Sequence, residues 1–233
     1  MPSVTEENIA EFQDLLLNWF KSNGRVFPWR DERLRSYQLI IAEVLLQRTR
    51  AETVAKFYNR FLTDFPDWKS LADANVADIA RYLEPIGLYN QRAKRLKSLA
   101  VEMVKRYGVI PFDRQELESI PFFGQYLANA VELTVFNQRS PLLDVNMARV
   151  LERYFGKRKL ADIRYDPYLQ DLSYKVVDHP DSKNLNWAIL DFAALICKAK
   201  TPLCNICFLA FKCNYFNEVS RNSGSEETKD LLS

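Results

Sequence analysis

The sequence is poor in glycine. Its 233 residues include only six glycines, under half of the roughly 7% that is usual in soluble proteins. Neither G-x-G-x-x-G nor G-x-x-x-x-G-K-[ST] occurs, which excludes Rossmann-type dinucleotide binding and P-loop nucleotide binding. The same scarcity argues against turn-dense β-sandwiches and collagen-like chains. A mostly helical protein is therefore expected.

A long apolar run and a strong excess of one charge are also missing. No segment approaches the about 18 apolar residues of a membrane helix, and the N-terminus lacks the pattern of a signal peptide. We therefore expect an intracellular, cytoplasmic protein with no membrane segment. Lys and Arg number 32 against 30 Asp and Glu, so the net charge of +2 gives no indication of nucleic-acid binding by itself.

Apolar residues recur at helical spacing along most of the chain. Thr5 is placed to cap a first helix and Gly24 to end it. Further helices are predicted over residues 37–49, 52–65, 75–83, 90–107, 125–136, 144–155 and 186–196. The segment 217–233 is polar and predicts a flexible tail. No β pattern is convincing, so an all-α fold is predicted.

The four cysteines lie in one short segment, at Cys197, Cys204, Cys207 and Cys213. Two disulfides are one interpretation, but disulfides are uncommon in intracellular proteins. The C-x6-C-x2-C-x5-C spacing instead indicates four thiolates around a metal. Both zinc and an iron–sulfur cluster accept such a ligand set, and coordination chemistry alone does not choose between them.

Two carboxylates stand out by their position. Glu43 interrupts the apolar segment 39–46, where burial disfavours a charged carboxylate and makes this residue a candidate proton donor. The alternative is that Glu43 emerges with Gln47 on a narrow polar strip. Asp144 opens a predicted helix as an ordinary N-cap, or as a carboxylate that the helix end keeps ionised beside a cationic transition state. One protonated and one ionised carboxylate are what cleavage of a glycosidic bond requires.

The segment 120–126 (IPFFGQY) joins two predicted helices by a short turn. Backbone N–H groups at the start of the second helix can bind a phosphate without any net charge on the protein. Taken alone, the segment favours an ordinary helix–helix connection.

Together these motifs resemble the helix-hairpin-helix DNA glycosylases of the endonuclease III superfamily, over residues 27–213. The resemblance rests on FPWR (27–30), AEVLLQRT (42–49), IGLYN (86–90), the hairpin, DVN (144–146) and the cysteine loop. It implies an all-α, two-lobed helix-hairpin-helix glycosylase fold with a four-cysteine iron–sulfur loop that holds a 4Fe-4S cluster. One lobe is expected over 24–137, as a six-helix domain with the hairpin. The other is expected over 1–23 plus 138–216, as the iron–sulfur cluster domain.

The first two of these motifs look like the mismatch branch, which comprises thymine-DNA mismatch glycosylases and MutY-type adenine glycosylases. Bifunctional relatives carry a hairpin lysine that attacks the sugar, whereas this chain has Tyr126, as the thymine enzymes do. The chain also ends soon after the cysteine loop, without the domain with which MutY-type enzymes read 8-oxoguanine. The resemblance implies a monofunctional DNA glycosylase in base excision repair. It would hydrolyse the N-glycosidic bond of a flipped thymine or uracil opposite guanine, without strong AP-lyase activity.

The resemblance also assigns roles to residues. Asp144 would stabilise the oxocarbenium sugar and help to place water, Glu43 would assist the departing base, and Tyr126 would line the base pocket. The implied DNA contacts are Gln47 and Arg48, which match a duplex-inserting stretch, together with Phe122, Gly124, Gln125 and Asn146. Trp187 stands near the base pocket, where mismatch enzymes carry a different residue, so a modified pyrimidine is a further candidate substrate. The expected partner is double-stranded DNA with a mismatched or damaged base, bound by a monomer at the nucleoid of a prokaryote.

Phe122 departs from the family hairpin, which usually has Gly at this place. If the position needs φ > 0 or a close phosphate approach, Phe costs stability or weakens DNA binding. Two alternative functions remain: an adenine-DNA glycosylase acting on A·G or A·8-oxoguanine mispairs, and a mismatch- or lesion-binding protein without catalysis. The basic stretch 92–97 is interpreted as a solvated helix face rather than a phosphate contact.

Overall fold

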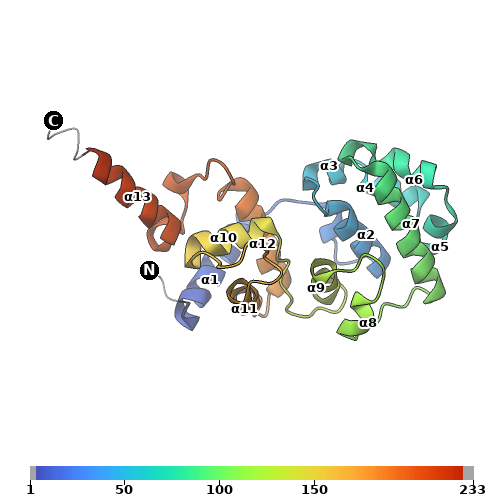
Figure 1. Ribbon diagram of the computed structural model, residues 1–233, viewed down its shortest axis with the longest axis horizontal. Helices are drawn as coiled ribbons and strands as arrows, with labels where there is room; N and C mark the ends of the chain where they lie inside the picture. Colours follow the sequence, from blue (N-terminus) through green and yellow to red (C-terminus); the bar gives the residue numbers. More distant parts are fainter. Residues whose placement is uncertain (1–3, 228–233) are drawn as a thin grey trace. The chain divides into compact units, whose positions relative to one another are not determined.

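The structure, a computed structural model, describes residues 4–227 and consists of helices joined by short loops (Figure 1). Because no strand occurs among these residues, the predicted all-α fold is confirmed. The chain divides into two compact units: unit 1 comprises Met1–Arg25 and Arg139–Ser233, and unit 2 comprises Val26–Gln138. Within the described range, every helix is too short or too polar to span a membrane.

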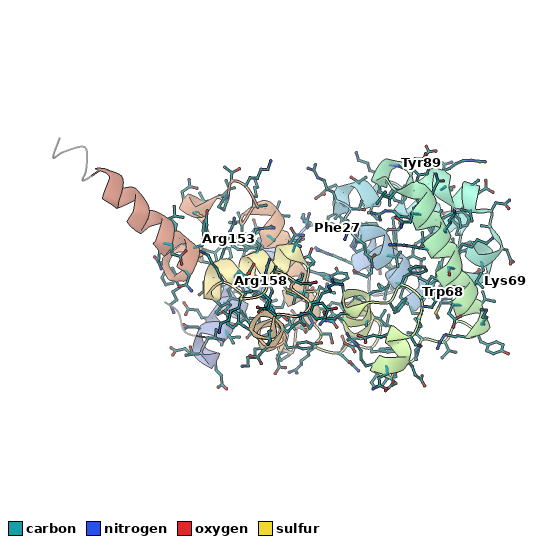
Figure 2. All side chains as sticks on the ribbon, viewed as in Figure 1. Phe27, Trp68, Lys69, Tyr89, Arg153 and Arg158 are labelled. Carbon is teal, nitrogen blue, oxygen red and sulfur yellow. The ribbon has the colours of Figure 1, made fainter. Side chains whose placement is uncertain are left out.

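Unit 2 contains the residues of the predicted hairpin. Its helices are η1 (Pro28–Arg30), α2 (Ser36–Leu46), α3 (Ala51–Ala55), α4 (Tyr58–Asp64), α5 (Trp68–Asp73), α6 (Val76–Leu83), η2 (Glu84–Ile86), α7 (Tyr89–Lys105), α8 (Arg114–Glu118) and α9 (Gln125–Thr134). The long helix α7 packs against α5 and α6, and α2 packs against α9. Trp68 at the start of α5 is buried, whereas its neighbour Lys69 is exposed and pairs with Asp73 (Figure 2). The α2–α9 contact is the one that positions the candidate site of this unit.

Unit 1 contains the cysteine loop. Its helices are α1 (Glu6–Asn23), α10 (Val145–Phe155), α11 (Pro167–Val177), α12 (Ser182–Leu195), η3 (Cys204–Ile206), η4 (Ala210–Lys212) and α13 (Asn214–Glu227). Helix α12 contacts α1, α10 and α11. The fully buried ring of Phe12 on α1 lies 4.8 Å from Tyr154 and 5.2 Å from Phe155 on α10, between ring centroids. Aromatic packing of this kind adds to the stabilisation from burial, and it fixes α10 against α1.

Several helices begin or end at capping residues that can be recognised in the sequence. The Thr5 side chain accepts a hydrogen bond from the Asn8 amide at 3.3 Å, and Gly24 ends α1, as predicted. Helices α5 and α11 escaped prediction although each carries a signal at its start. Asp67 and Ser70 form a capping box at α5, and Asp166 precedes Pro167 at the first position of α11. The apolar residues that follow each signal are too few for their spacing alone to distinguish a helix from a loop.

Two predicted segments have a different form in the structure. The helix predicted over 52–65 is two helices, α3 and α4, because the backbone leaves the helical region at Phe57, with φ −125° and ψ −9°. The segment 217–233, predicted as a flexible tail, is helical up to Glu227 as part of α13, and residues 228–233 lie outside the described residues. Polar composition was thus a poor guide to backbone conformation in this segment.

A buried ion pair ties the end of α1 to α12 within unit 1. Asp191 is fully buried and accepts hydrogen bonds from the backbone N–H of Arg25 at 2.7 Å and from its Nε at 2.8 Å. We expect Asp191→Ala to lower the free energy of unfolding by about 3 kcal/mol, because it leaves donors of Arg25 unpaired in a mostly buried position. Urea unfolding measures this change. Asp178→Ala is the matched control, since its pair with Arg139 is exposed, and an equal loss in both variants would contradict the assignment.

Candidate functional site

Unit 2 brings two of the predicted catalytic residues together. Glu43 lies on α2 among apolar neighbours, and only 7% of it is exposed. Tyr126 lies in the first turn of α9, and its hydroxyl donates a hydrogen bond to Oε2 of Glu43 at 3.3 Å. Gln47 is exposed at the end of α2, so Glu43 does not share a solvent-facing strip with it. The pair presents a carboxyl and a phenol that can bind, or exchange a proton with, a group brought against them.

Tyr58 on α4 is a neighbour of Glu43 that sequence reasoning missed. It is fully buried, and its hydroxyl donates to the carbonyl oxygen of Gln38 at 2.8 Å. Burial and, to a smaller extent, the charge of Glu43 raise the pKa of Tyr58 above its ordinary value. The phenol therefore stays neutral at physiological pH and fixes α4 against α2 beside the carboxyl group.

In unit 1, Asp144 caps α10. Its Oδ1 accepts hydrogen bonds from the amides of Asn146 at 2.8 Å and Met147 at 2.9 Å, and its Oδ2 accepts from the Asn146 side chain at 2.6 Å. The residue is only partly buried. Asp144 is therefore an N-cap of α10. Capping also places its carboxylate at the positive end of the helix, where negative charge is favoured.

A chain of hydrogen bonds runs from this carboxylate to the cysteine loop. Asn146 donates through Nδ2 to Asp144 and accepts through Oδ1 from Nη1 of Arg149 at 3.1 Å. Arg149 in turn donates through Nε to the Cys197 carbonyl at 2.9 Å and through Nη2 to the Ala193 carbonyl at 3.0 Å. Both ends of the Asn146 side chain are thus engaged within the protein, and its DNA contact stays a prediction. Sequence reasoning missed Arg149, although it follows Asn146 by one helical turn.

The segment that precedes Asp144 is anchored to α12. Asn186 is fully buried, accepts a hydrogen bond from the Leu142 amide at 2.7 Å, and donates to the Ser182 carbonyl at 2.9 Å. Trp187, the predicted base-pocket residue, follows it on α12 and is half-buried. The Asn186 tether fixes the approach of the chain to Asp144, because the buried amide N–H of Leu142 has its acceptor there.

The hairpin of unit 2 connects α8 to α9 through a strained turn. Phe122 has φ +72°, in the left-handed region, and is 47% exposed. The condition φ > 0 that the sequence analysis set for this residue is therefore met, and a non-glycine residue in this region costs about 1 kcal/mol. Gly124 caps α9 with φ −84°, and a Cβ at this position would meet nothing within 4 Å. The amide of Gln125 follows at the first position of α9, so the turn leaves open space beside the start of this helix.

Arg114 braces the same hairpin from α8. Its guanidinium pairs with Glu132 at 2.9 Å and with Glu118 at 2.7 Å, and it donates to Oδ1 of Asn129 at 2.7 Å. Glu132 and Asn129 lie on α9 and are mostly buried. The ion pairs and hydrogen bonds fix the angle between α8 and α9, which sequence spacing alone did not reveal.

The predicted duplex-inserting residues lie in the turn after α2. Gln47 ends the helix and Arg48 has φ +55°, and both side chains are exposed. Nη2 of Arg92, on α7, donates to the Gln47 carbonyl at 2.9 Å. The turn is thus held by a contact from α7, while its two side chains stay accessible.

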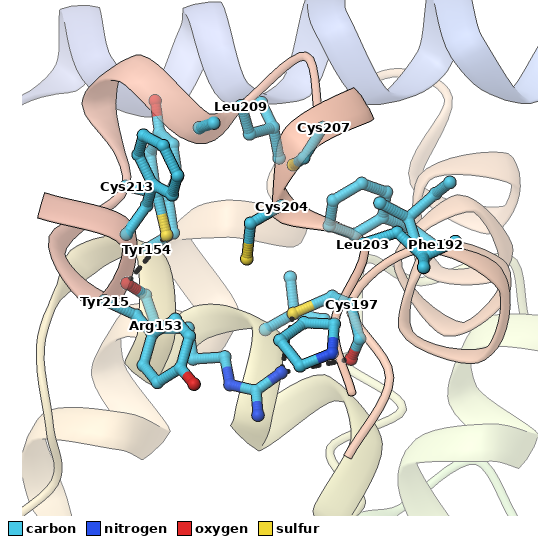
Figure 3. A pocket seen from close by; sticks show the side chains of 15 residues that line it. Arg153, Tyr154, Phe192, Cys197, Leu203, Cys204, Cys207, Leu209, Cys213 and Tyr215 are labelled. Atoms are coloured by element: carbon cyan, nitrogen blue, oxygen red, sulfur yellow. Dashed lines mark hydrogen bonds between the residues drawn. The ribbon is translucent and has the colours of Figure 1, made fainter. Parts of the chain in front are cut away.

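The four cysteines of unit 1 line one cavity (Figure 3). The cavity is small, about 30 Å³ in volume, and the thiols of Cys197, Cys204, Cys207 and Cys213 share its wall with apolar side chains. All four cysteines are free, so the disulfide interpretation is not supported. Within residues 4–227, no three His, Cys, Asp or Glu side chains meet closely enough to hold a single metal ion.

The donor set fits a metal cluster chemically. Burial raises the pKa of the Cys207 thiol to about 11, and burial also raises the pKa values of Cys204 and Cys213. Partly buried thiols of this kind become thiolates when a cation replaces their protons. Arg153 on α10 reaches the same cavity: its Nη1 lies 3.3 Å from Sγ of Cys197 and its guanidinium stacks over Tyr215, as Figure 3 shows. Its positive charge offsets that of the thiolates.

Comparison with known proteins identifies relatives of this chain. Residues 41–165 match the family described as "HhH-GPD superfamily base excision DNA repair protein". A "Thymine/uracil-DNA glycosylase" from Pyrobaculum aerophilum is 38% identical over 206 residues, which are 86% of this chain and 89% of the relative. An "Adenine DNA glycosylase" from Buchnera aphidicola subsp. Acyrthosiphon pisum is 31% identical over 87% of this chain and 58% of the relative.

A solved structure is also similar. The structure of a thermostable thymine-DNA glycosylase matches with a TM-score of 0.83 and 30% identity, covering 91% of this chain and 98% of that one. The resemblance and the fold class inferred from the sequence motifs are thereby confirmed.

Proposed function

Because the chain belongs to the HhH-GPD superfamily of base excision DNA repair proteins, we propose that it is a monofunctional DNA glycosylase that removes thymine or uracil mispaired with guanine. The observation that carries the proposal is the contact between Tyr126 and Glu43. The side chain that the first turn of α9 presents to this buried carboxyl is a phenol, which forms no Schiff base with the sugar. Base release without strand cleavage follows from that chemistry.

The proposed reaction is hydrolysis of the N-glycosidic bond of a nucleotide flipped out of the duplex. The C1′–N bond breaks, the oxygen of water bonds to C1′, and one proton of this water leaves with the base in the net reaction. Glu43 assists the departing base by a hydrogen bond or proton, and Tyr126 holds that carboxyl and lines the base pocket. Asp144 stabilises the positive charge that develops on the sugar and helps to place the water. Its three hydrogen bonds hold the carboxylate in one orientation.

Binding of double-stranded DNA is assigned to accessible turns. Gln47 and Arg48 enter the duplex beside the flipped base, and the hairpin residues Phe122, Gly124 and Gln125 contact the backbone. Trp187 shapes the base pocket. The two lobes inferred from the resemblance are assigned to unit 1 and unit 2, and the protein acts as an intracellular monomer on DNA with a mismatched or damaged base.

We assign a 4Fe-4S cluster to Cys197, Cys204, Cys207 and Cys213. The support is the cavity that the four thiols share, its basic neighbour Arg153, and the family-type spacing of the cysteines. Bound there, the cluster supplies four metal–thiolate bonds that hold the loop 197–213 against α10 and α12. The link through Arg149 then makes the position of Asp144 depend on this loop.

The choice of thymine or uracil over adenine is supported by the 38% identical relative and by Tyr126. Adenine excision remains the second candidate, because relatives of that activity are up to 31% identical over most of this chain. A binding protein without catalysis is the third, because Phe122 strains the hairpin.

A base-release assay tests the function. Purified protein is incubated with duplexes that carry T·G, U·G, A·G or A·8-oxoguanine, and the products are resolved before and after alkali treatment. We expect strand breaks from T·G and U·G only after alkali, which reveals abasic sites. Strand breaks without alkali would contradict the monofunctional assignment, release of adenine would establish the second candidate, and binding without any release would establish the third.

A further inference from the structure

Three arginines of unit 2 lie together at the start of α7 and the end of α2. Arg92 is half-buried, and its pKa is lowered by burial first and then by the positive charges of Arg95 and Arg48. Within residues 4–227, none of these three forms an ion pair with a carboxylate. Nε of Arg92 is buried and lacks a hydrogen-bond partner in the described structure. A cluster of like charges with a free buried donor is unfavourable unless an anion joins it.

Phe122 adds an aromatic ring to this cluster. The guanidinium carbon of Arg95 lies 5.6 Å from the centroid of the Phe122 ring, within the range of a cation–π contact. The ring is 47% exposed, so it combines a half-buried apolar surface with a positive φ of +72°. The contact with Arg95 is a specific interaction that a glycine at this position could not make.

We propose that Arg92 and Arg95, beside Arg48, form a binding site for backbone phosphodiesters of DNA, and that Phe122 is a positioning residue that holds Arg95 in this site. The inference rests on the proposed function in that DNA is the ligand. Guanidinium groups bind phosphate oxygens through paired N–H donors. The exposed side chain of Arg95 offers such donors, and Arg92 adds positive charge beside it. The interpretation of 92–97 as a solvated helix face therefore changes for Arg92 and Arg95. The hairpin of the family usually binds phosphate through glycine amides. In this chain, the hairpin also orients the cationic side chain of Arg95.

Salt dependence of DNA binding tests the phosphate contact. The affinity of the intact protein for an undamaged duplex is measured by fluorescence anisotropy from 50 to 200 mM salt. We expect Arg95→Gln to weaken binding about tenfold at the lowest salt and to reduce the slope of log Kd against log salt by about 0.9. Arg81→Gln is the matched control, since Arg81 is exposed on α6 and pairs with Asp78. Equal effects of the two substitutions would overturn the proposal, because only net charge would then matter.

Substitutions of Phe122 distinguish two roles of its ring: positioning of Arg95, or obstruction of DNA binding by the hairpin. We expect Phe122→Gly to weaken duplex binding about two- to five-fold through loss of the ring. Phe122→Tyr, which keeps the ring, should bind more tightly than Phe122→Gly. In the Arg95→Gln background, Phe122→Gly should weaken binding less than it does in the parent. If the ring merely blocks the hairpin, Phe122→Gly would instead strengthen binding in both backgrounds, and that result would overturn the proposal.

The test of the phosphate site can fail or succeed independently of the test of the proposed function. Binding to undamaged duplex requires no base release, so the Arg95 and Phe122 effects are expected whichever base the protein removes. Excision of thymine with binding that is insensitive to both substitutions would overturn the site while leaving the function intact. Inorganic phosphate at millimolar concentration should compete with the duplex more weakly in Arg95→Gln than in the parent at constant ionic strength, and equal competition would contradict a phosphate site that includes Arg95.

Discussion

Replacement of Asp144 by asparagine is expected to lower the rate of base release by at least about 10³-fold while duplex DNA binds as tightly as before. The substitution removes one negative charge from a group that would face the cationic sugar in the transition state. Loss of one preorganised electrostatic contact of this kind costs about 10²–10³ in rate, and a full charge beside an oxocarbenium ion costs more. The effect belongs to the chemical step, so ground-state affinity for DNA does not change.

The fold should survive this change because asparagine caps helices as well as aspartate does. The side-chain oxygen at position 144 can still accept from the amides of Asn146 and Met147, which lie 2.8 and 2.9 Å from Oδ1 in the parent. Only the contact of Oδ2 with the Asn146 side chain, at 2.6 Å, is lost or reversed. We therefore expect the free energy of unfolding to fall by no more than about 1 kcal/mol.

Single-turnover base release, followed by alkali and electrophoresis, measures the rate, and anisotropy measures binding. Asp67→Asn is the matched control: Asp67 caps α5 and accepts from the Ser70 amide at 2.7 Å, with no role in the proposed chemistry. It should leave the rate unchanged. Excision by Asp144→Asn at the parental rate would remove Asp144 from the mechanism, and an equal loss in both variants would assign the effect to helix capping.

The sequence predicts the helices and caps of this chain well because their signals are local. Thr5, Gly24 and Asp144 each act on neighbours within four residues, and all three cap or end helices as predicted. The cysteine spacing likewise indicated a shared site, and the structure brings the four thiols to one cavity.

The contacts that organise the candidate site could not be predicted from the sequence, because they join residues that are distant along the chain. Arg149 and Cys197 are 48 positions apart, and their hydrogen bond exists only because α10 packs against α12. The arginine cluster shows the same limit, since Arg48 and Arg92 meet only when α7 returns to the end of α2. Helical spacing identifies which face of a helix is buried, but it does not identify the partner of that face. For Phe122 the sequence could state only a condition on φ, which depends on the turn that forms.

Replacement of Cys207 by serine is expected to abolish cluster binding, and with it much of the stability of unit 1. The loop 197–213 contains only the short helices η3 and η4, so few backbone hydrogen bonds hold it by themselves. A serine hydroxyl is a far weaker ligand than a thiolate, because it remains protonated and binds iron poorly. Loss of the metal–thiolate bonds should release the loop and the carbonyl of Cys197 to which Arg149 is bound.

We expect the parent protein to contain about four irons per chain and to absorb near 400 nm, whereas Cys207→Ser should lack both features and unfold at a Tm lower by about 10 °C or more. Ala199→Ser is the matched control, since it adds a hydroxyl at an exposed position of the same loop and removes no thiol. Zinc instead of iron in the parent would refute the cluster while retaining a metal site. A parent without metal whose Tm equals that of Cys207→Ser would refute both, because the half-buried Cys207 thiol would then pack as an ordinary apolar side chain.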